Sequence, residues 1–214
     1  MSEIRIKICG LSTPETVRAC ANAGANMVGF VFFAKSPRNV DPLQAKHCAL
    51  TAPSHMKRVG LFVEPDDETL RRILASVPID IIQVHDASDP YRISGIRSLT
   101  GKLVYAAVGI AGKKDLENAA AVEHVADGMF YDAKAPKESH IPGGRGVAFD
   151  WTIMRNHTFS KPWLLAGGLN SENVAEAVMT TGAPGVDVSS GVESSVGQKD
   201  PAKINAFIKS VRAI

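Results

Sequence analysis

Short apolar runs alternate with segments of helical spacing along the chain. Residues 4–8 read Ile-Arg-Ile-Lys-Ile, and this alternation predicts a strand with one apolar face. The next segment, Ser12-Thr13-Pro14-Glu15, is typical of a capping box, and Val17, Cys20 and Ala21 then follow at helical spacing. The chain is therefore predicted to begin with a strand, a loop and a helix.

The same alternation continues through the rest of the sequence. Further strands are predicted at residues 27–33, 59–63, 79–84, 103–108 and 128–131, and in short apolar runs that begin at Leu164 and Gly185. Helix starts are predicted at Asp41-Pro42, Asp66, Asp89-Pro90, Lys113, Asn170 and Asp200-Pro201. Strands that alternate with helices predict an α/β protein, either a closed barrel or a doubly wound open sheet.

Two glycine-rich junctions favour the closed barrel. The run from Leu164 continues into Gly167-Gly168, and the run from Gly185 continues into Ser190-Gly191. Glycine has no Cβ, so backbone N–H groups can approach an anion closely there, and a helix start just beyond adds a positive dipole. Because a (β/α)8 TIM barrel places its phosphate site after strands seven and eight, we predict this fold and a phosphate site at these junctions.

Length and charge indicate one domain with a small-molecule ligand. We expect a single (β/α)8 barrel domain over residues 1–214, which is long enough for an ample core. Lys and Arg number 24 against 22 Asp and Glu, and a net charge of +2 is too small to indicate nucleic acid or a membrane as a partner. The sequence shows no basic and apolar leader and no apolar run of about 18 residues, so we expect a cytoplasmic protein.

The cysteines indicate reduced thiols, one of which has a candidate role. Cys9, Cys20 and Cys48 show neither a disulfide framework nor a zinc-binding spacing, so we expect no metal site. In the first strand the isoleucines share one face, and Lys7 and Cys9 therefore share the other, which points toward the barrel axis. Cys9 is either a small buried thiol or, because of the cation beside it, a thiol whose pKa is lowered toward a usable thiolate.

Further candidate residues lie near other strand ends. Asp132 follows the sixth strand and is either a solvated loop residue or a carboxyl group that keeps a proton near neutral pH. Gln83 and His85 share a face of the fourth strand, where His85 could pack in the core or face a pocket. In the loop after the second strand, Arg38 offers a bidentate fork suited to a carboxylate. The long loop at residues 133–148 is of a length that is often functional.

Several motifs, taken in order, resemble those of one enzyme family. They are Lys7-Ile8-Cys9-Gly10, Ser36-Pro37-Arg38, Gln83 with His85, Asp132-Ala133-Lys134, Gly143-Gly144-x-Gly146 with Phe149-Asp150-Trp151, Ala166-Gly167-Gly168-Leu169, and Asp187 with Ser189-Ser190-Gly191-Val192-Glu193. From end to end the chain resembles the phosphoribosylanthranilate isomerases. The resemblance implies a (β/α)8 barrel that catalyses the isomerisation step of tryptophan biosynthesis on a phosphorylated small molecule, without a cofactor, as a monomer or homodimer.

The resemblance also implies roles for individual residues. Cys9 would be the general base, Asp132 the general acid, and Arg38 a partner of the anthranilate carboxylate. The other implied substrate contacts are Lys7, Gln83, His85 and Asp187, and the implied phosphate contacts are Gly144, Gly167, Gly168, Ser190 and Gly191. Two residues depart from the family, which usually has glycine in place of Asp86 and a small or uncharged residue in place of Arg145. A carboxylate at Asp86 would repel a dianionic substrate unless it is directed away.

The implied reaction needs one acid and one base. Opening the aminofuranose ring requires a proton on the ring oxygen, and removing a proton from the adjacent carbon converts the imine to an enolamine, which tautomerises to the ketone. Asp132 must then keep a proton although its ordinary pKa is about 3.9, and Cys9 must lose one although its ordinary pKa is about 8.5, so we expect their pKa values to shift in opposite directions. Another sugar-phosphate barrel, such as an epimerase or a lyase, and a ligand-binding barrel without turnover are the alternatives.

Overall fold

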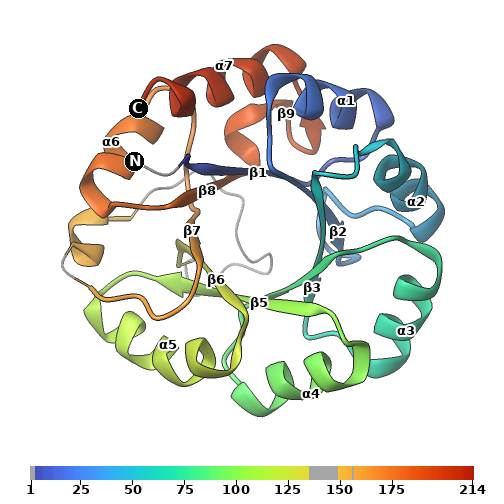
Figure 1. The fold of residues 1–214 in the computed structure, drawn as a ribbon, viewed down its shortest axis with the longest axis horizontal. Helices are drawn as coiled ribbons and strands as arrows, with labels where there is room; N and C mark the ends of the chain where they lie inside the picture. Colours follow the sequence, from blue (N-terminus) through green and yellow to red (C-terminus); the bar gives the residue numbers. More distant parts are fainter. Residues whose placement is uncertain (1–2, 135–148, 156) are drawn as a thin grey trace.

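Eight parallel strands close into a barrel in the computed structural model, which describes residues 3–134, 149–155 and 157–214 (Figure 1). The strands are β1 (Arg5–Cys9), β2 (Met27–Phe32), β3 (Lys57–Val63), β4 (Ile81–His85), β5 (Leu103–Ile110), β6 (Gly128–Ala133), β7 (Trp163–Leu165) and β8 (Gly185–Val188). β8 pairs in parallel with β1, so the sheet has no open edge. The predicted (β/α)8 barrel is confirmed and the open sheet is excluded.

Helices form a ring around this barrel (Figure 1). They are α1 (Pro14–Ala23), α2 (Pro42–Thr51), α3 (Asp67–Ser76), α4 (Pro90–Thr100), α5 (Lys113–Val125), α6 (Val174–Thr181) and α7 (Pro201–Arg212). The short 3-10 helices η1 (Trp151–Met154) and η2 (Ser190–Val192) precede β7 and follow β8. After η2 the chain forms an antiparallel hairpin of β9 (Glu193–Ser195) and β10 (Gln198–Lys199).

Side-chain caps fix where most of these helices begin. The aspartates that accept hydrogen bonds from first-turn N–H groups are Asp41, Asp66, Asp89 and Asp200. At α1 the cap is Thr13, whose hydroxyl accepts from the Thr16 N–H at 3.3 Å. The predicted capping box between Ser12 and Glu15 is therefore wrong, because the helix begins one residue later than that pairing requires.

The helix after β7 also begins later than predicted. α6 starts at Val174 rather than at Asn170, because the Asn170 side chain accepts hydrogen bonds from the backbone N–H groups of Glu172 and Asn173, at 2.8 and 3.1 Å, and so forms a turn first. Between β6 and β7 the described residues form η1 and no α-helix. The predicted functional loop at residues 133–148 lies almost wholly outside the described residues.

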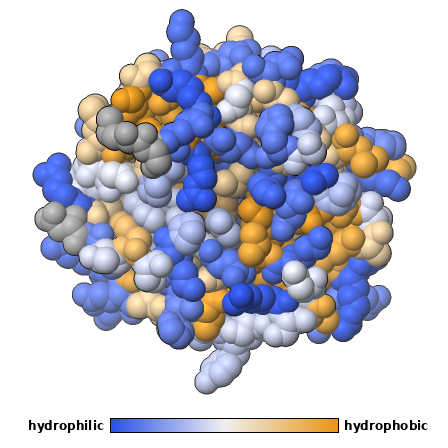
Figure 2. All heavy atoms as spheres, in the orientation of Figure 1, coloured by the Kyte–Doolittle hydropathy of each residue, from blue (hydrophilic) through white to orange (hydrophobic). Residues whose placement is uncertain are grey.

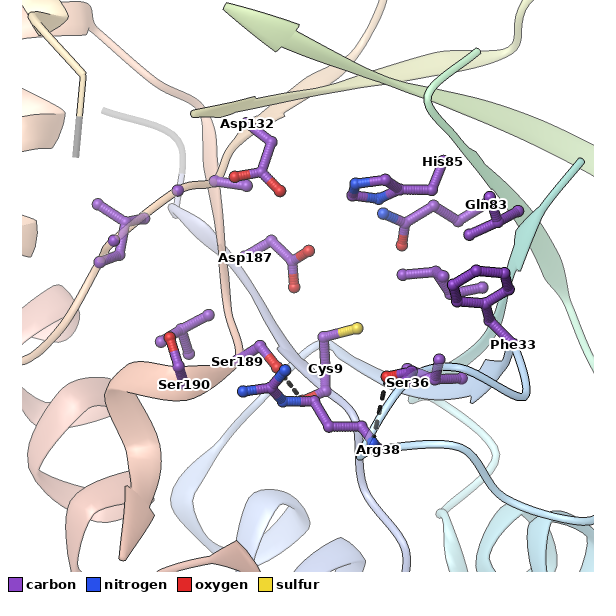
Figure 3. A pocket seen from close by; sticks show the side chains of 18 residues that line it. Cys9, Phe33, Ser36, Arg38, Gln83, His85, Asp132, Asp187, Ser189 and Ser190 are labelled. Carbon is purple, nitrogen blue, oxygen red and sulfur yellow. Dashed lines mark hydrogen bonds between the residues drawn. The ribbon is translucent and has the colours of Figure 1, made fainter. Parts of the chain in front are cut away.

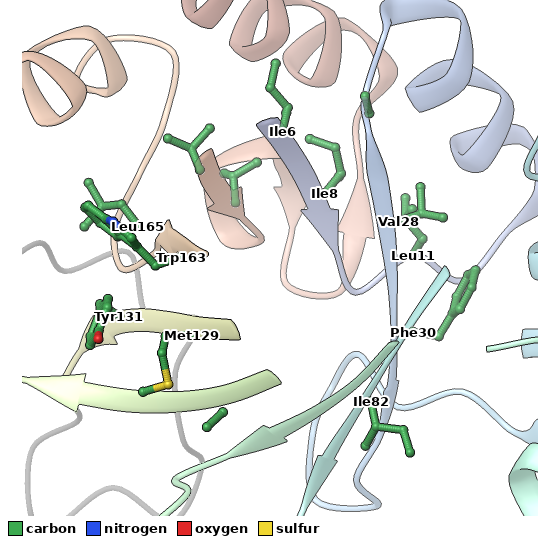
Figure 4. Packing of buried hydrophobic residues seen from close by; sticks show 14 of the residues in the cluster. Ile6, Ile8, Leu11, Val28, Phe30, Ile82, Met129, Tyr131, Trp163 and Leu165 are labelled. Carbon is green, nitrogen blue, oxygen red and sulfur yellow. The ribbon is translucent and has the colours of Figure 1, made fainter. Parts of the chain in front are cut away.

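Apolar side chains pack in two layers, one outside the barrel and one inside it, and Figure 4 shows part of the outer layer. Ile6 and Ile8 of β1 belong to the outer layer, which lies between the strands and the helices. Met27 and Phe130 belong to the inner layer. Lys7 points inward, and its Nζ lies 4.9 Å from the centroid of the Phe130 ring. The predicted division of β1 into an apolar outer face and a chemical inner face is confirmed.

The surface is mainly hydrophilic at the end of the barrel seen in Figure 2. Apolar residues gather on one side of this view, over the region where Figure 1 places β2 and β3. In the part of the chain that the structure describes, the helices are too short or too polar for any of them to cross a membrane.

Phe207 should contribute strongly to stability. It is fully buried on α7, which packs against α1 and β1. Phe207→Ala should lower the free energy of unfolding by about 3–5 kcal/mol because it removes buried apolar area and leaves a cavity. Tyr91→Ala is the control, since Tyr91 is 87% exposed and a change there should stay within about 0.5 kcal/mol. Urea unfolding followed by circular dichroism measures both, and similar values for the two variants would contradict the described packing.

Candidate active site

A pocket opens where the barrel strands end (Figure 3). The empty space in it, with open solvent at the mouth included, is about 680 Å³. Cys9, His85 and Asp132 stand at or next to the ends of β1, β4 and β6, and Asp187 projects from β8. Because parallel strands in a barrel all end on the same side, residues far apart in the sequence meet in this pocket.

A buried ion pair stands next to the pocket. Lys7 Nζ donates to both carboxylate oxygens of Asp187 at 2.9 Å, and Lys7 is fully buried. The two residues are register partners in β1 and β8. Burial disfavours the ammonium charge, but Asp187 outweighs this effect and raises the pKa of Lys7. Asp187 contributes to the pocket lining, whereas Lys7 lies behind it.

The Cys9 thiol points into the pocket, although only 4% of the residue is exposed (Figure 3). Burial raises the pKa of Cys9, and the opposing effect of Lys7 is smaller. The prediction that Lys7 lowers this pKa below its ordinary value is therefore wrong. The physical reason is that burial penalises a thiolate more than the nearby ammonium group favours it, and the negative charge of Asp187 adds to the upward shift.

Asp132 lies across the pocket from Cys9 (Figure 3). Burial raises the pKa of Asp132; His85 acts against this shift, and the negative charge of Asp187 adds to it. The predicted upward shift is confirmed. The carboxyl group can thus keep a proton at a pH where an exposed aspartate would be ionised.

Gln83 and His85 project from β4 into the same pocket (Figure 3). Their exposed fractions are 2% and 8%. Within the described residues, Gln83 Oε1 and His85 Nδ1 have no hydrogen-bond partner. Because a buried polar atom without a partner costs free energy, both atoms are suited to polar groups of a ligand.

Asp86 follows His85 in a backbone conformation that favours glycine. Its φ is +54°, in the left-handed region, which accounts for the glycine that resembling sequences usually carry there. The Asp86 side chain is 57% exposed, and its Oδ1 lies 4.0 Å from His85 Nε2. The carboxylate is therefore directed largely to solvent, beside the pocket rather than into it.

Arg38 lines the pocket, but its fork is bound to a carboxylate of the chain itself. Nε and Nη2 of Arg38 donate to Oε1 and Oε2 of Glu193 at 2.7 and 2.8 Å. Lys199 Nζ donates to the same Glu193 Oε1 at 2.6 Å. Sequence reasoning did not predict Glu193 and Lys199 as site residues, because their role depends on the β9–β10 hairpin folding back toward the loop after β2.

The glycine junctions after β7 and β8 lie at the pocket, with one exception. Gly167, Gly168 and Ser190 line it, and the two glycines have φ values of +88° and +64°. A Cβ at Gly167 would also come within 2.9 Å of Asp132 Oδ1, so this glycine is needed for close packing as well. Gly191 does not line the pocket. It packs instead against the backbone of Leu169, which a Cβ at this position would overlap.

Gly191 therefore has a packing explanation that sequence reasoning missed. The predicted phosphate contact at Gly144 and the departure at Arg145 both lie outside the described residues. The pocket also has an apolar wall that the sequence analysis did not name, formed by Val31, Phe33, Leu61 and Val63. Their alternation along β2 and β3 was the signal that could have placed them on the inward face.

The arrangement combines groups for proton transfer with groups for ligand binding. The thiol of Cys9 and the carboxyl group of Asp132 both face the pocket (Figure 3). The unpartnered polar atoms of Gln83 and His85 line it as well. The backbone of the glycine-rich loop after β7 completes the lining. Among the residues that the structure describes, no cluster of three or more His, Cys, Asp or Glu could hold a metal ion. The chemistry that these groups can perform is acid and base catalysis.

Comparisons with known proteins agree on one family. The family model of N-(5'-phosphoribosyl)anthranilate (PRA) isomerase matches residues 6–210. The N-(5'-phosphoribosyl)anthranilate isomerase of Paracoccus denitrificans is 50% identical over 210 residues, which are 98% of each chain. That of Rhodospirillum centenum is 46% identical over 212 residues, which are 99% of each chain.

Solved structures support the same assignment. The phosphoribosyl anthranilate isomerase of Thermotoga maritima superposes with a TM-score of 0.87 and 32% identity, covering 99% of this chain and 100% of that one. A phosphoribosyl anthranilate isomerase in complex with reduced 1-(o-carboxyphenylamino)-1-deoxyribulose 5-phosphate gives a TM-score of 0.84 and 31% identity, with the same coverage. With its fold, its motifs and its full-length relatives in agreement, this chain belongs to the N-(5'-phosphoribosyl)anthranilate isomerase family.

Proposed function

We propose that Cys9 and Asp132 are the general base and the general acid in the isomerisation of N-(5'-phosphoribosyl)anthranilate, the reaction for which the family is named. The product is 1-(2-carboxyphenylamino)-1-deoxyribulose 5-phosphate. As a member of this family the chain is an isomerase of tryptophan biosynthesis. The observation that carries the residue assignment is that a buried thiol and a partly buried carboxyl group face each other across one pocket. Family membership also favours this reaction over an epimerase, a lyase or a barrel without turnover.

The pocket suggests how the substrate would be oriented. The apolar wall of Val31, Phe33, Leu61 and Val63 suits the aromatic ring, and Arg38 beside it suits the carboxylate. The backbone of Gly167 and Gly168, with Ser190, suits the phosphate. The ribose would then lie between these ends, where Gln83 Oε1 and His85 Nδ1 can accept or share hydrogen bonds with its hydroxyl groups. Lys7 would act indirectly, through Asp187.

Each proposed catalytic group has one task. Asp132 gives its proton to the ring oxygen as the C–O bond of the furanose breaks, and Cys9 takes a proton from the neighbouring carbon as the imine becomes an enolamine. The enolamine then tautomerises to the ketone. Because burial favours the thiol form of Cys9, only a fraction of molecules hold the thiolate, but a thiolate of high pKa is also the stronger base.

The setting of this activity is also a proposal. We place the protein in the cytoplasm because its substrate and product are soluble phosphorylated metabolites. The chain would act as a monomer or a homodimer, since the Thermotoga maritima relative is described both as dimeric and as monomers generated from the dimer. Nucleic acid and membranes are not proposed as partners, given the small net charge of +2.

Replacing the base should abolish most of the turnover and leave the pocket in place. Cys9→Ala should lower kcat by about 10²-fold or more, because the proton on the substrate carbon has no acceptor. Binding of the reduced product analogue, measured by calorimetry, should change little. Cys48→Ala is the matched control, since Cys48 is an equally buried thiol on α2. Near-normal kcat in Cys9→Ala would exclude Cys9 as the base.

Asp132 should control the alkaline side of the pH profile. Above both pKa values Asp132 has lost its proton, and below both values Cys9 still holds one, so kcat/KM should decline at both ends. In Asp132→Asn the amide does not titrate, so kcat should fall about 10²-fold or more and the decline at high pH should disappear. Asp41→Asn, which keeps a capping side chain on α2, should retain both declines. A profile of unchanged shape in Asp132→Asn would refute the assignment.

The phosphate site can be tested by charge rather than by bulk. Gly191→Val would push against the Leu169 backbone and disturb the fold, so it cannot report on binding alone. Ser190→Asp places a carboxylate in the pocket lining. It should lower the affinity for the reduced product analogue by about tenfold or more, because the carboxylate repels the phosphate of that ligand. Ser194→Asp, at an exposed position of β9, is the control. Equal affinities in calorimetry would mean that the phosphate binds elsewhere.

A further inference from the structure

Three charged side chains form a buried cluster on one side of the pocket. Arg38, Glu193 and Lys199, here called the Arg38–Glu193–Lys199 cluster, are 8%, 7% and 8% exposed. Glu193 lies at the centre, because it accepts from Arg38 through both oxygens, at 2.7 and 2.8 Å, and from Lys199 at 2.6 Å. Such a bidentate contact fixes the plane of a guanidinium group as well as its position.

Glu193 keeps its negative charge within this cluster. Burial disfavours a charged Glu193, but hydrogen bonds from Arg38 and Lys199 outweigh this and lower the pKa of Glu193. The carboxylate is therefore available to hold both cations in place beside the pocket.

The cluster is also joined to the loop that follows β8. Lys199 Nζ donates to the carbonyl oxygen of Ser189 at 2.9 Å and to its hydroxyl oxygen at 3.2 Å. The Ser189 hydroxyl in turn donates to the carbonyl oxygen of Cys9 at 3.2 Å (Figure 3). One set of contacts therefore runs from the fork of Arg38 to the backbone of the proposed base.

The β9–β10 hairpin holds this cluster against the loop that carries Arg38. At the tip of the hairpin, Gly197 has φ +82°, and its N–H donates to Glu193 Oε2 at 3.2 Å. A Cβ at Gly197 would come within 2.7 Å of the Pro37 carbonyl oxygen, so the tip packs closely on the residue before Arg38. Lys203 on α7 holds the other side, because its Nζ donates to the Glu193 carbonyl oxygen at 2.6 Å.

From this geometry we propose that Glu193 and Lys199 are positioning residues of the active site. Glu193 fixes the plane and position of the Arg38 guanidinium group beside the pocket, where the substrate carboxylate would bind, and Lys199 fixes the Ser189 loop beside the phosphate end. Neither residue contacts the reacting atoms. The proposal rests on the proposed function, in which Arg38 recognises the carboxylate.

The test compares two ligands that differ only in the carboxylate. They are the reduced product analogue, 1-(o-carboxyphenylamino)-1-deoxyribulose 5-phosphate in reduced form, and its counterpart with a plain phenylamino group. Their affinity ratio, measured by calorimetry, reports how much the protein gains from the carboxylate. In the parent protein this ratio should be about 10- to 100-fold, the range for hydrogen bonds to a charged group.

Glu193→Gln should reduce that ratio to less than about a third of the parent value, because an amide cannot accept from both arms of the fork. In steady-state kinetics the same variant should raise KM at least about tenfold with kcat within about threefold, which separates positioning from catalysis. Glu193→Asp is the second variant and should lower the ratio too, since it keeps the charge but is one methylene too short to hold the fork.

Lys199→Met should lower the affinity for both ligands by a similar factor, because it leaves the contacts between Glu193 and Arg38 in place.

Glu123→Gln is the matched control. Glu123 on α5 is also 7% exposed, and it accepts from the Ser160 N–H and hydroxyl and from the Lys161 N–H, away from the pocket. This variant should lower the melting temperature without changing the ligand ratio. An unchanged ratio in both Glu193 variants, alongside a large ratio in the parent, would overturn the positioning role. A ratio near one in the parent itself would instead overturn the proposed role of Arg38.

Discussion

The closure of β8 onto β1 is the constraint on which the site depends. It pairs Lys7 with Asp187, which are 180 residues apart in sequence, inside a dry barrel. Either charge alone would cost several kcal/mol in that environment, so the two are stable there only together. This pair lies beside Cys9, where Lys7 opposes and Asp187 adds to the upward shift of the thiol pKa that burial causes.

The fold was predictable because its signals are local. Asp–Pro steps mark helix starts at Asp41, Asp89 and Asp200, and alternation in residues 4–8 places Lys7 and Cys9 on the inner face. These features arise from short-range capping and from the geometry of a single strand. The errors at Ser12 and Asn170 are local too: Thr13 caps α1 in place of Ser12, and the Asn170 side chain forms a turn before α6 begins.

The electrostatics of the site were not predictable in the same way. Adjacency of Lys7 and Cys9 along one strand suggested a lowered pKa, but burial within the closed barrel outweighs that cation, and Asp187, from the other end of the chain, adds to the upward shift. The sequence likewise predicted that the fork of Arg38 binds a ligand carboxylate, whereas in the structure Nε and Nη2 of Arg38 bind Glu193. Pair interactions between distant segments decide charge states, and a single sequence does not contain their distances.

The contact between Gly191 and Leu169 has a consequence for how such a barrel can change. Because the backbone of one loop fills the space where the other loop would carry a Cβ, the connections after β7 and β8 are interlocked and must vary together. Insertions or chain breaks tolerated by an isolated surface loop would here displace both halves of the proposed phosphate site at once. Divergence toward new substrates is therefore easier at the apolar wall formed by β2 and β3, where one side chain can be exchanged without moving a second loop.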